Sequence, residues 1–141
     1  MANRIITFEK AVNEAIFSEM KRDKRVFLFG LDVTDHKRIF GTTKGLEIFG
    51  RNRFFGTPLS EDAMTGVALG AAITGLRPIH VHIRVDFLLL AMNQLINMVA
   101  IARSGSAGKL KAPIVIRAII GRGWGQGFQH SKSLQSLFAH I

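Results

Sequence analysis

Apolar residues recur along the chain in two alternating patterns, one with helical spacing and one made of short unbroken runs. The first pattern extends from Phe8 to Met20, where apolar residues fall three or four positions apart, and Thr7 is placed to cap the first turn. The run RVFLFG follows at 25–30 and is typical of a buried strand that ends at a glycine. The chain therefore begins with a predicted helix and a predicted strand.

The same alternation continues to the last residue. The helix over 61–74 is rich in alanine and glycine and has Ser60 as its expected cap, so we expect it to pack closely at the centre of the domain. The other expected elements are a short helix at 43–49, a weak strand at 53–57, a strand at 77–83, a helix at 87–103, a strand at 113–120 and a short helix at 131–140.

This order of elements predicts the fold class. Strands separated by helices imply right-handed crossovers, and therefore a three-layer α/β domain with a parallel sheet and helices on both faces. The sequence contains no internal repeat, linker or low-complexity tract, so residues 1–141 are expected to form one domain. The chain stops two residues after Ala139 with no polar tail, and we expect the C-terminal part of the domain to be missing.

Charge and composition narrow the range of partners. The formal net charge is +9, which favours a nucleic acid, a phosphorylated cofactor or an acidic protein surface as partner. The basic residues are scattered and do not form one run, so we expect no nucleic-acid partner. Cysteine is absent and no apolar stretch approaches the roughly 20 residues of a membrane helix, which predicts a soluble, cytoplasmic protein without a membrane partner.

Several residues could carry chemistry, and each has a structural alternative. Glu61 at a helix start either stabilises the helix dipole or serves a site. The glycine-rich segment 121–127 matches neither a dinucleotide fingerprint nor a P-loop, so it is expected to line a site as a mobile loop. His130 lies at a strand-to-helix junction, where ligands bind in α/β sheets. His80 and His82 alternate on one strand face, and packing is favoured over metal binding because no third ligand is near.

One segment carries a family resemblance. The string TPLSEDAMTGVALGAAITGLRP, residues 57–78, resembles the beta subunit of the decarboxylase component of 2-oxoacid dehydrogenases of the pyruvate, branched-chain and acetoin types. The pyrimidine-binding domain of that subunit also occurs in transketolase. The similarity continues through Phe87, 94–97, 113–117 and 129–131, and so covers nearly the whole chain.

The resemblance implies thiamine diphosphate as cofactor and specific roles for four residues. Glu61 is implied to be a catalytic residue that hydrogen-bonds N1′ of the aminopyrimidine, and Phe87 to pack on that ring. His130 is implied to be catalytic, facing the reacting carbon during acyl transfer to a lipoyl group. The backbone carbonyl of Ile114 is implied to hold a structural potassium ion. The implied reaction is decarboxylation of a 2-oxo acid with transfer of the acyl group to a lipoyl carrier.

The resemblance also implies partners. In the family an alpha subunit holds Mg²⁺ and the diphosphate on a Gly-Asp-Gly…Asn motif, which this sequence lacks. We therefore expect a chain that is inactive alone and that works with an alpha subunit, a second beta subunit and a lipoyl acyltransferase. The C-terminal domain of the family's beta subunit is also absent from this sequence.

Two alternatives stay open, a split transketolase that moves two-carbon ketol units and a non-catalytic basic binding module on the same fold. The sequence departs from the family pattern at Leu31, Arg84, Asn93 and 125–128, positions that bear on the substrate and the lipoyl partner.

Overall fold

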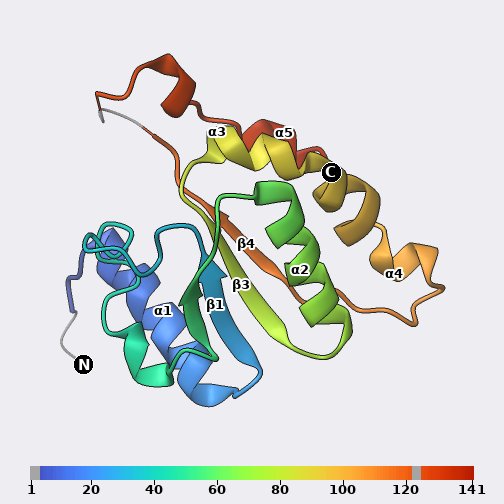
Figure 1. The fold of residues 1–141 in the computed structure, drawn as a ribbon, viewed down its shortest axis with the longest axis horizontal. Coiled ribbons are helices and arrows are strands. Elements are labelled where there is room, and N and C mark those ends of the chain that lie inside the picture. Colours follow the sequence, from blue (N-terminus) through green and yellow to red (C-terminus); the bar gives the residue numbers. More distant parts are fainter. Residues whose placement is uncertain (1–3, 122–124) are drawn as a thin grey trace.

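The computed structural model describes residues 4–121 and 125–141, and its centre is a four-stranded parallel sheet (Figure 1). The strand order is β2-β1-β3-β4, and all three neighbouring pairs are parallel. The strands are β1 (Val26–Gly30), β2 (Phe54–Gly56), β3 (Arg77–His82) and β4 (Val115–Ala118). Because the strands are parallel, their carboxyl ends lie at one edge of the sheet, where ligands bind in open α/β folds.

Helices cover both faces of this sheet, which confirms the predicted three-layer α/β class (Figure 1). Helix α1 (Phe8–Arg22) covers one face, where Leu28 lies in the larger hydrophobic core. Helix α2 (Glu61–Ile73) covers the other face, where Phe29 packs with the small residue Ala68. Neighbouring residues of β1 thus point to opposite faces, and an unbroken apolar run is buried on both sides.

The predicted helix over 87–103 is wrong as a continuous α-helix. The structure has a series of short segments there, and the Ala100 amide donates to the Leu95 carbonyl at 2.9 Å, the wider hydrogen-bond pattern of a π-helix. Apolar spacing alone does not distinguish such turns from α-helix. The segments are α3 (Val85–Leu88), a 3₁₀ turn (Leu89–Ala91), a π-helix (Gln94–Val99) and α4 (Ala102–Gly105).

Shorter elements complete the described chain. The predicted short helix near residue 45 is a 3₁₀ turn, Leu46–Phe49, and the predicted last helix is α5 (Gln135–Ala139), preceded by a 3₁₀ turn at Phe128–His130. The expected side-chain caps are wrong: the Ser60 hydroxyl makes no cap hydrogen bond, and the Thr7 hydroxyl donates to the Glu9 carboxylate at 2.7 Å. Helix α2 nevertheless begins at Glu61, as predicted.

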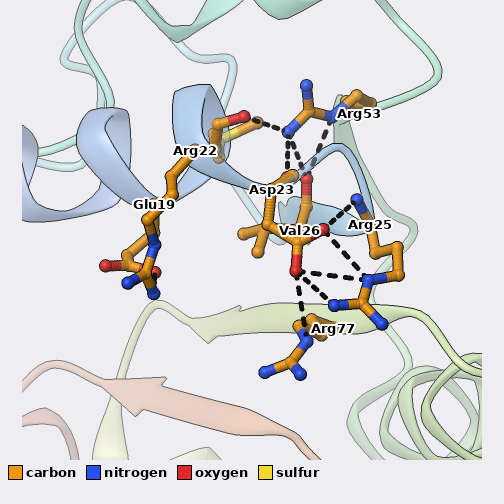
Figure 2. Close-up of polar contacts among 8 residues, drawn as sticks. Glu19, Arg22, Asp23, Arg25, Val26, Arg53 and Arg77 are labelled. Carbon is orange, nitrogen blue, oxygen red and sulfur yellow. Dashed lines mark hydrogen bonds and ion pairs between the residues drawn. The ribbon is translucent and has the colours of Figure 1, made fainter.

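Arg53 joins three elements at the amino end of the sheet (Figure 2). Its guanidinium donates to the backbone carbonyls of Met20, Asp23 and Val26, and the Nε–oxygen distance to Val26 is 3.0 Å. These carbonyls belong to the end of α1, the turn after it and the start of β1. A planar guanidinium can serve several acceptors at once, so this side chain fixes where the helix meets the sheet.

Asp23 lies beside this junction and binds two further arginines (Figure 2). Its carboxylate accepts hydrogen bonds from the Arg25 side chain and backbone amide, and it forms an ion pair with Arg77 at 3.3 Å. The hydrogen bonds from Arg25 lower the pKa of Asp23 to about 2. The amino end of the sheet is thus organised around one carboxylate and three arginines, away from the edge where ligands are expected.

Candidate functional site

A small pocket lies at the carboxyl edge of the sheet, where β1 and β3 end and α2 begins. Its cavity volume is about 20 Å³, which accommodates about one water molecule. An aromatic ring would therefore lie across the mouth of the pocket and would need another surface to enclose it. The lining residues come from three segments: Leu31 after β1; Thr57, Pro58, Leu59, Ser60, Glu61 and Met64 around the start of α2; and His80, Val81, His82, Ile83, Arg84 and Phe87 from β3 onward.

Glu61 contributes the acidic group of this pocket. It is the first residue of α2 and is half-buried, and its backbone carbonyl accepts a hydrogen bond from the Thr65 hydroxyl at 2.7 Å. Within residues 4–121 and 125–141 its carboxylate has no hydrogen-bond or ion-pair partner. The carboxylate is therefore available to a ligand, and the positive end of the helix dipole favours its charge.

Phe87 connects the pocket of Glu61 to His130. Phe87, in α3, lines the pocket, and its ring lies 5.2 Å from the His130 ring at an interplanar angle of 72°. His130 does not itself line the pocket. The structure thus places Glu61 and Phe87 in one pocket and His130 against the outer side of Phe87, so the three predicted site residues lie in one region.

The backbone of His130 packs tightly against Gly121. A Cβ atom on Gly121 would lie 1.9 Å from the His130 carbonyl oxygen, a distance that no side chain can occupy. The His130 ring is held on its other side, where Nδ1 lies 3.1 Å from the Gln126 carbonyl oxygen. The prediction that 121–127 lines a site falls partly on residues 122–124, which are outside the described residues.

His80 and His82 are buried, as the packing interpretation predicted. Their rings lie 4.3 Å apart, His80 stacks on Phe29, and His82 Nε2 lies 3.3 Å from the Thr65 hydroxyl. Burial lowers the pKa of His80 to about 4, and burial together with the charge of His80 lowers the pKa of His82 to about 3. Both rings are therefore neutral at neutral pH, and these two residues bring no charge to the pocket.

Arg84 is a charged residue of the pocket that the sequence analysis named only as a departure from the family pattern. It lies two residues after the end of β3, only 7% of its surface is exposed, and one guanidinium nitrogen donates to the Gln126 side-chain oxygen at 2.8 Å. Burial lowers its pKa, while the charges of Asp32 and Asp86 oppose that shift. Its position after a strand that ends at the ligand-binding edge is the signal that could have identified it.

Ile114 lies away from this pocket. It directly precedes β4, at the amino end of the sheet, and packs against the core beneath α2. The potassium ion on its carbonyl stays a prediction. In the described part of the chain, no group of three or more histidine, cysteine, aspartate or glutamate side chains is arranged to hold a metal ion.

The fold and the pocket define a parallel α/β domain with an acid and an aromatic ring at its ligand-binding edge. The family model described as "Transketolase, pyrimidine binding domain" matches residues 4–141, and the chain belongs to that family.

Three curated relatives agree with the resemblance seen in the sequence. The chain is 42% identical to a rice (Oryza sativa subsp. japonica) protein named pyruvate dehydrogenase E1 component subunit beta-4, chloroplastic, over 99% of this chain and 35% of that protein. It is 39% identical to the beta subunit of Cupriavidus necator acetoin:2,6-dichlorophenolindophenol oxidoreductase, over 98% and 44% of the two chains. It is 41% identical to the Bacillus subtilis 2-oxoisovalerate dehydrogenase subunit beta, over 96% and 42%. The chain thus spans about two fifths of the length of these relatives.

Further expectations concern the membrane, the location in the cell and nucleic acid. Among the described residues, no helix is long and apolar enough to cross a membrane. Cytoplasmic location stays a prediction, and the rice relative is named as chloroplastic. The expected lack of a nucleic-acid partner also stays a prediction.

Proposed function

We propose that this chain is the pyrimidine-binding half of a thiamine-diphosphate-dependent 2-oxoacid dehydrogenase. The whole enzyme would decarboxylate a 2-oxo acid and pass the acyl group to a lipoyl carrier. The observation that carries the proposal is the Glu61 carboxylate, which has no partner among the described residues and lies in the same pocket as Phe87, with His130 against that ring. The names of the three relatives, all subunits of oxidoreductases, support the same class of reaction.

Glu61 and Phe87 have the chemistry needed at the pyrimidine end of the cofactor. The Glu61 carboxyl group would hydrogen-bond N1′ of the aminopyrimidine and exchange a proton at that atom, while Phe87 would offer its face to the ring. General acid–base groups of this kind contribute about 10²–10⁴-fold to rate. When bound, thiamine diphosphate supplies the nucleophilic carbon that attacks the keto group of the substrate.

The two neutral histidines of the pocket suit this role. His80 and His82 line the same pocket as Glu61 and carry no charge at neutral pH. A hydrogen bond from a carboxyl group to a ring nitrogen is stronger where water is excluded. The cavity of about 20 Å³ supports a half-site, because a second surface would have to enclose the ring.

The diphosphate end would belong to a partner. Mg²⁺ prefers carboxylate oxygens together with phosphates and water, and the described residues offer no cluster of such ligands. The proposal therefore includes an alpha subunit that holds Mg²⁺ and the diphosphate, a second beta subunit and a lipoyl acyltransferase. His130 would act later, moving a proton during acyl transfer to the lipoyl group.

Glu61→Gln tests this assignment, with Asp62→Asn as the matched control. Asp62 is the next residue of α2, and its carboxylate accepts a hydrogen bond from the Gln94 side chain at 3.4 Å. The chain is purified with an alpha-type subunit, thiamine diphosphate and Mg²⁺, and hydrogen exchange at C2 of the cofactor is measured. Glu61→Gln should slow exchange at least ~100-fold, and Asp62→Asn should leave it near the wild-type rate. Near-normal exchange in Glu61→Gln would overturn the role of Glu61.

Turnover then separates the alternatives. Reduction of 2,6-dichlorophenolindophenol by the complex with pyruvate or a branched 2-oxo acid is expected for a dehydrogenase. A split transketolase would instead transfer ketol units between sugar phosphates, and a non-catalytic module would do neither while still binding its partner.

A further inference from the structure

The hydrogen bond to His130 determines which ring nitrogen carries a proton. Nδ1 of His130 lies 3.1 Å from the backbone carbonyl oxygen of Gln126. A carbonyl oxygen only accepts, so Nδ1 must be the donor. In a neutral imidazole one nitrogen is a donor and the other an acceptor, so Nε2 is left as the nitrogen that accepts a proton.

The side chain of Gln126 is in turn held by Arg84. One guanidinium nitrogen of Arg84 donates to the Gln126 side-chain oxygen at 2.8 Å, and the other donates to the Ile83 carbonyl at 2.9 Å. Arg84 is buried and lies two residues after the end of β3, so it is anchored to the sheet. Gln126 itself is exposed and lies outside any helix or strand. Arg84 is therefore the group that connects this exposed residue to the rigid part of the fold.

A second connection lies on the other side of His130. Lys132 forms an ion pair with the buried Asp86 at 3.0 Å, and the Lys132 backbone amide lies 3.3 Å from the same oxygen. With the Phe87–His130 ring contact, the segment 126–132 meets 84–87 at three points. Of these, the Arg84–Gln126 contact is the one that reaches the residue whose backbone carbonyl accepts the His130 hydrogen bond.

We propose that Arg84 is a positioning residue that holds Gln126 so that its carbonyl fixes His130 in the Nδ1-protonated tautomer. Nε2 of His130 is then ready to accept a proton. The role of this tautomer in acyl transfer rests on the proposed function, whereas the tautomer is a property of the chain itself. Loss of the Arg84 contact would release Gln126, and the His130 ring would then adopt the mixture of tautomers of a histidine in water.

Long-range ¹H–¹⁵N correlation spectra of the histidine-labelled chain, without cofactor, test this directly. At about pH 9 an ordinary imidazole is neutral, so the spectra report the tautomer of each histidine. The wild-type chain should show His130 mainly as the Nδ1-protonated form. Arg84→Met should lose at least half of that form, and Arg84→Lys, which can still donate to Gln126, should restore part of it. Arg51→Met, at an exposed arginine, is the matched control and should change nothing.

A second variant covers the case in which Arg84→Met fails to fold. Gln126→Met removes the side-chain oxygen at an exposed position and keeps the backbone carbonyl, so it should shift the His130 tautomer as Arg84→Met does. Wild-type His130 protonated on Nε2, or an unchanged tautomer in Arg84→Met or Gln126→Met, would overturn the proposal. Glu61→Gln should leave the tautomer unaltered, so failure here is distinct from failure of the proposed function.

Discussion

The rings of Phe87 and His130 meet edge to face, with centroids 5.2 Å apart and an interplanar angle of 72°. In this arrangement the electropositive edge of one ring meets the electron-rich face of the other, a contact worth about 0.5–1.5 kcal/mol beyond area burial. Phe87 also lines the pocket that contains Glu61. One aromatic side chain therefore contacts both the pocket and the histidine proposed to act in the second half of the reaction.

Phe87→Leu should test the ring contact with His130 separately from the packing of the side chain. Leucine keeps most of the buried volume and removes the ring, so the protein should stay folded while the His130 ring protons lose the chemical-shift effect of the neighbouring aromatic ring. Proton spectra of the wild-type and variant chains measure this change. Phe128→Leu is the control, because Phe128 is 84% exposed and should leave the His130 signals in place. Unchanged His130 signals in Phe87→Leu would contradict the ring contact.

The layers of this fold are predictable from sequence because burial imposes them. An apolar run such as 26–29 is buried on both sides only when helices cover both faces of the sheet. The structure places Leu28 on the α1 side and Phe29 on the α2 side. The π-helix at Gln94–Val99 and the missing Ser60 cap were not predictable, because both depend on local hydrogen-bond geometry that apolar spacing does not encode.

The candidate site was predictable only in part. The position of Glu61 at a helix start left two interpretations open, and its expected role in the site came from the family resemblance of residues 57–78. The contact between Arg84 and Gln126 was not predictable, because it joins residues far apart in sequence, and only the fold brings them to 2.8 Å. Both residues lie at positions that depart from the family pattern, and in the fold these two positions touch.

The buried histidines predict a loss of stability in mild acid. The folded-state pKa values of His80 and His82 are about 4 and about 3, below the ordinary 6.5 of the unfolded chain. Between these values the unfolded chain binds more protons than the folded chain, so stability falls as the pH falls from about 6.5 toward 4. By pH 5 each histidine should cost about 2 kcal/mol of unfolding free energy relative to pH 7.

Urea unfolding at pH 7 and pH 5 measures this loss. The double variant His80→Leu/His82→Leu should lose most of the difference in unfolding free energy between pH 7 and pH 5, whatever its stability at pH 7. His36→Gln, at an exposed histidine, should keep the wild-type difference. If the double variant retains the full wild-type difference, the loss arises elsewhere in the chain.

Two glycines should respond to alanine in opposite directions. A Cβ on Gly30 would lie 2.1 Å from the Val81 carbonyl oxygen of the neighbouring strand, and the Gly30 φ of +155° also disfavours a side chain. Gly70 lies inside α2 with no atom within 4 Å of the added Cβ. Gly30→Ala should therefore destabilise the protein by at least ~3 kcal/mol or prevent folding, since backbone must move.

Gly70→Ala should stabilise the same protein by about 0.5–1 kcal/mol, because alanine is the better helix former. Thermal unfolding of both variants under identical conditions distinguishes the two effects. Equal destabilisation by the two substitutions would mean that Gly70 also has a close neighbour, contrary to the structure.

Arg53 offers a test of the amino end of the sheet. Its guanidinium donates to the carbonyls of Met20, Asp23 and Val26 and lies 5.1 Å from the centroid of the Phe49 ring (Figure 2 labels Asp23 and Val26). Hydrogen bonds from a charged donor are worth about 1.5–3 kcal/mol, and methionine keeps the length of the side chain without any donor. Arg53→Met should therefore lower the unfolding free energy by about 2–3 kcal/mol.

Arg53→Lys should recover only part of this loss, because a lysine ammonium lacks the planar fork that reaches several carbonyls at once. Arg51→Met removes an exposed arginine two residues away and should change stability by less than about 0.5 kcal/mol. Urea unfolding of the three variants at pH 7 measures these differences. The pocket lies at the opposite edge of the sheet, so the Arg53 variants should keep the wild-type His130 tautomer in the folded state. An Arg53→Met variant as stable as Arg51→Met would show that the three carbonyls are equally well satisfied by water, and the junction would then owe its stability to apolar packing alone.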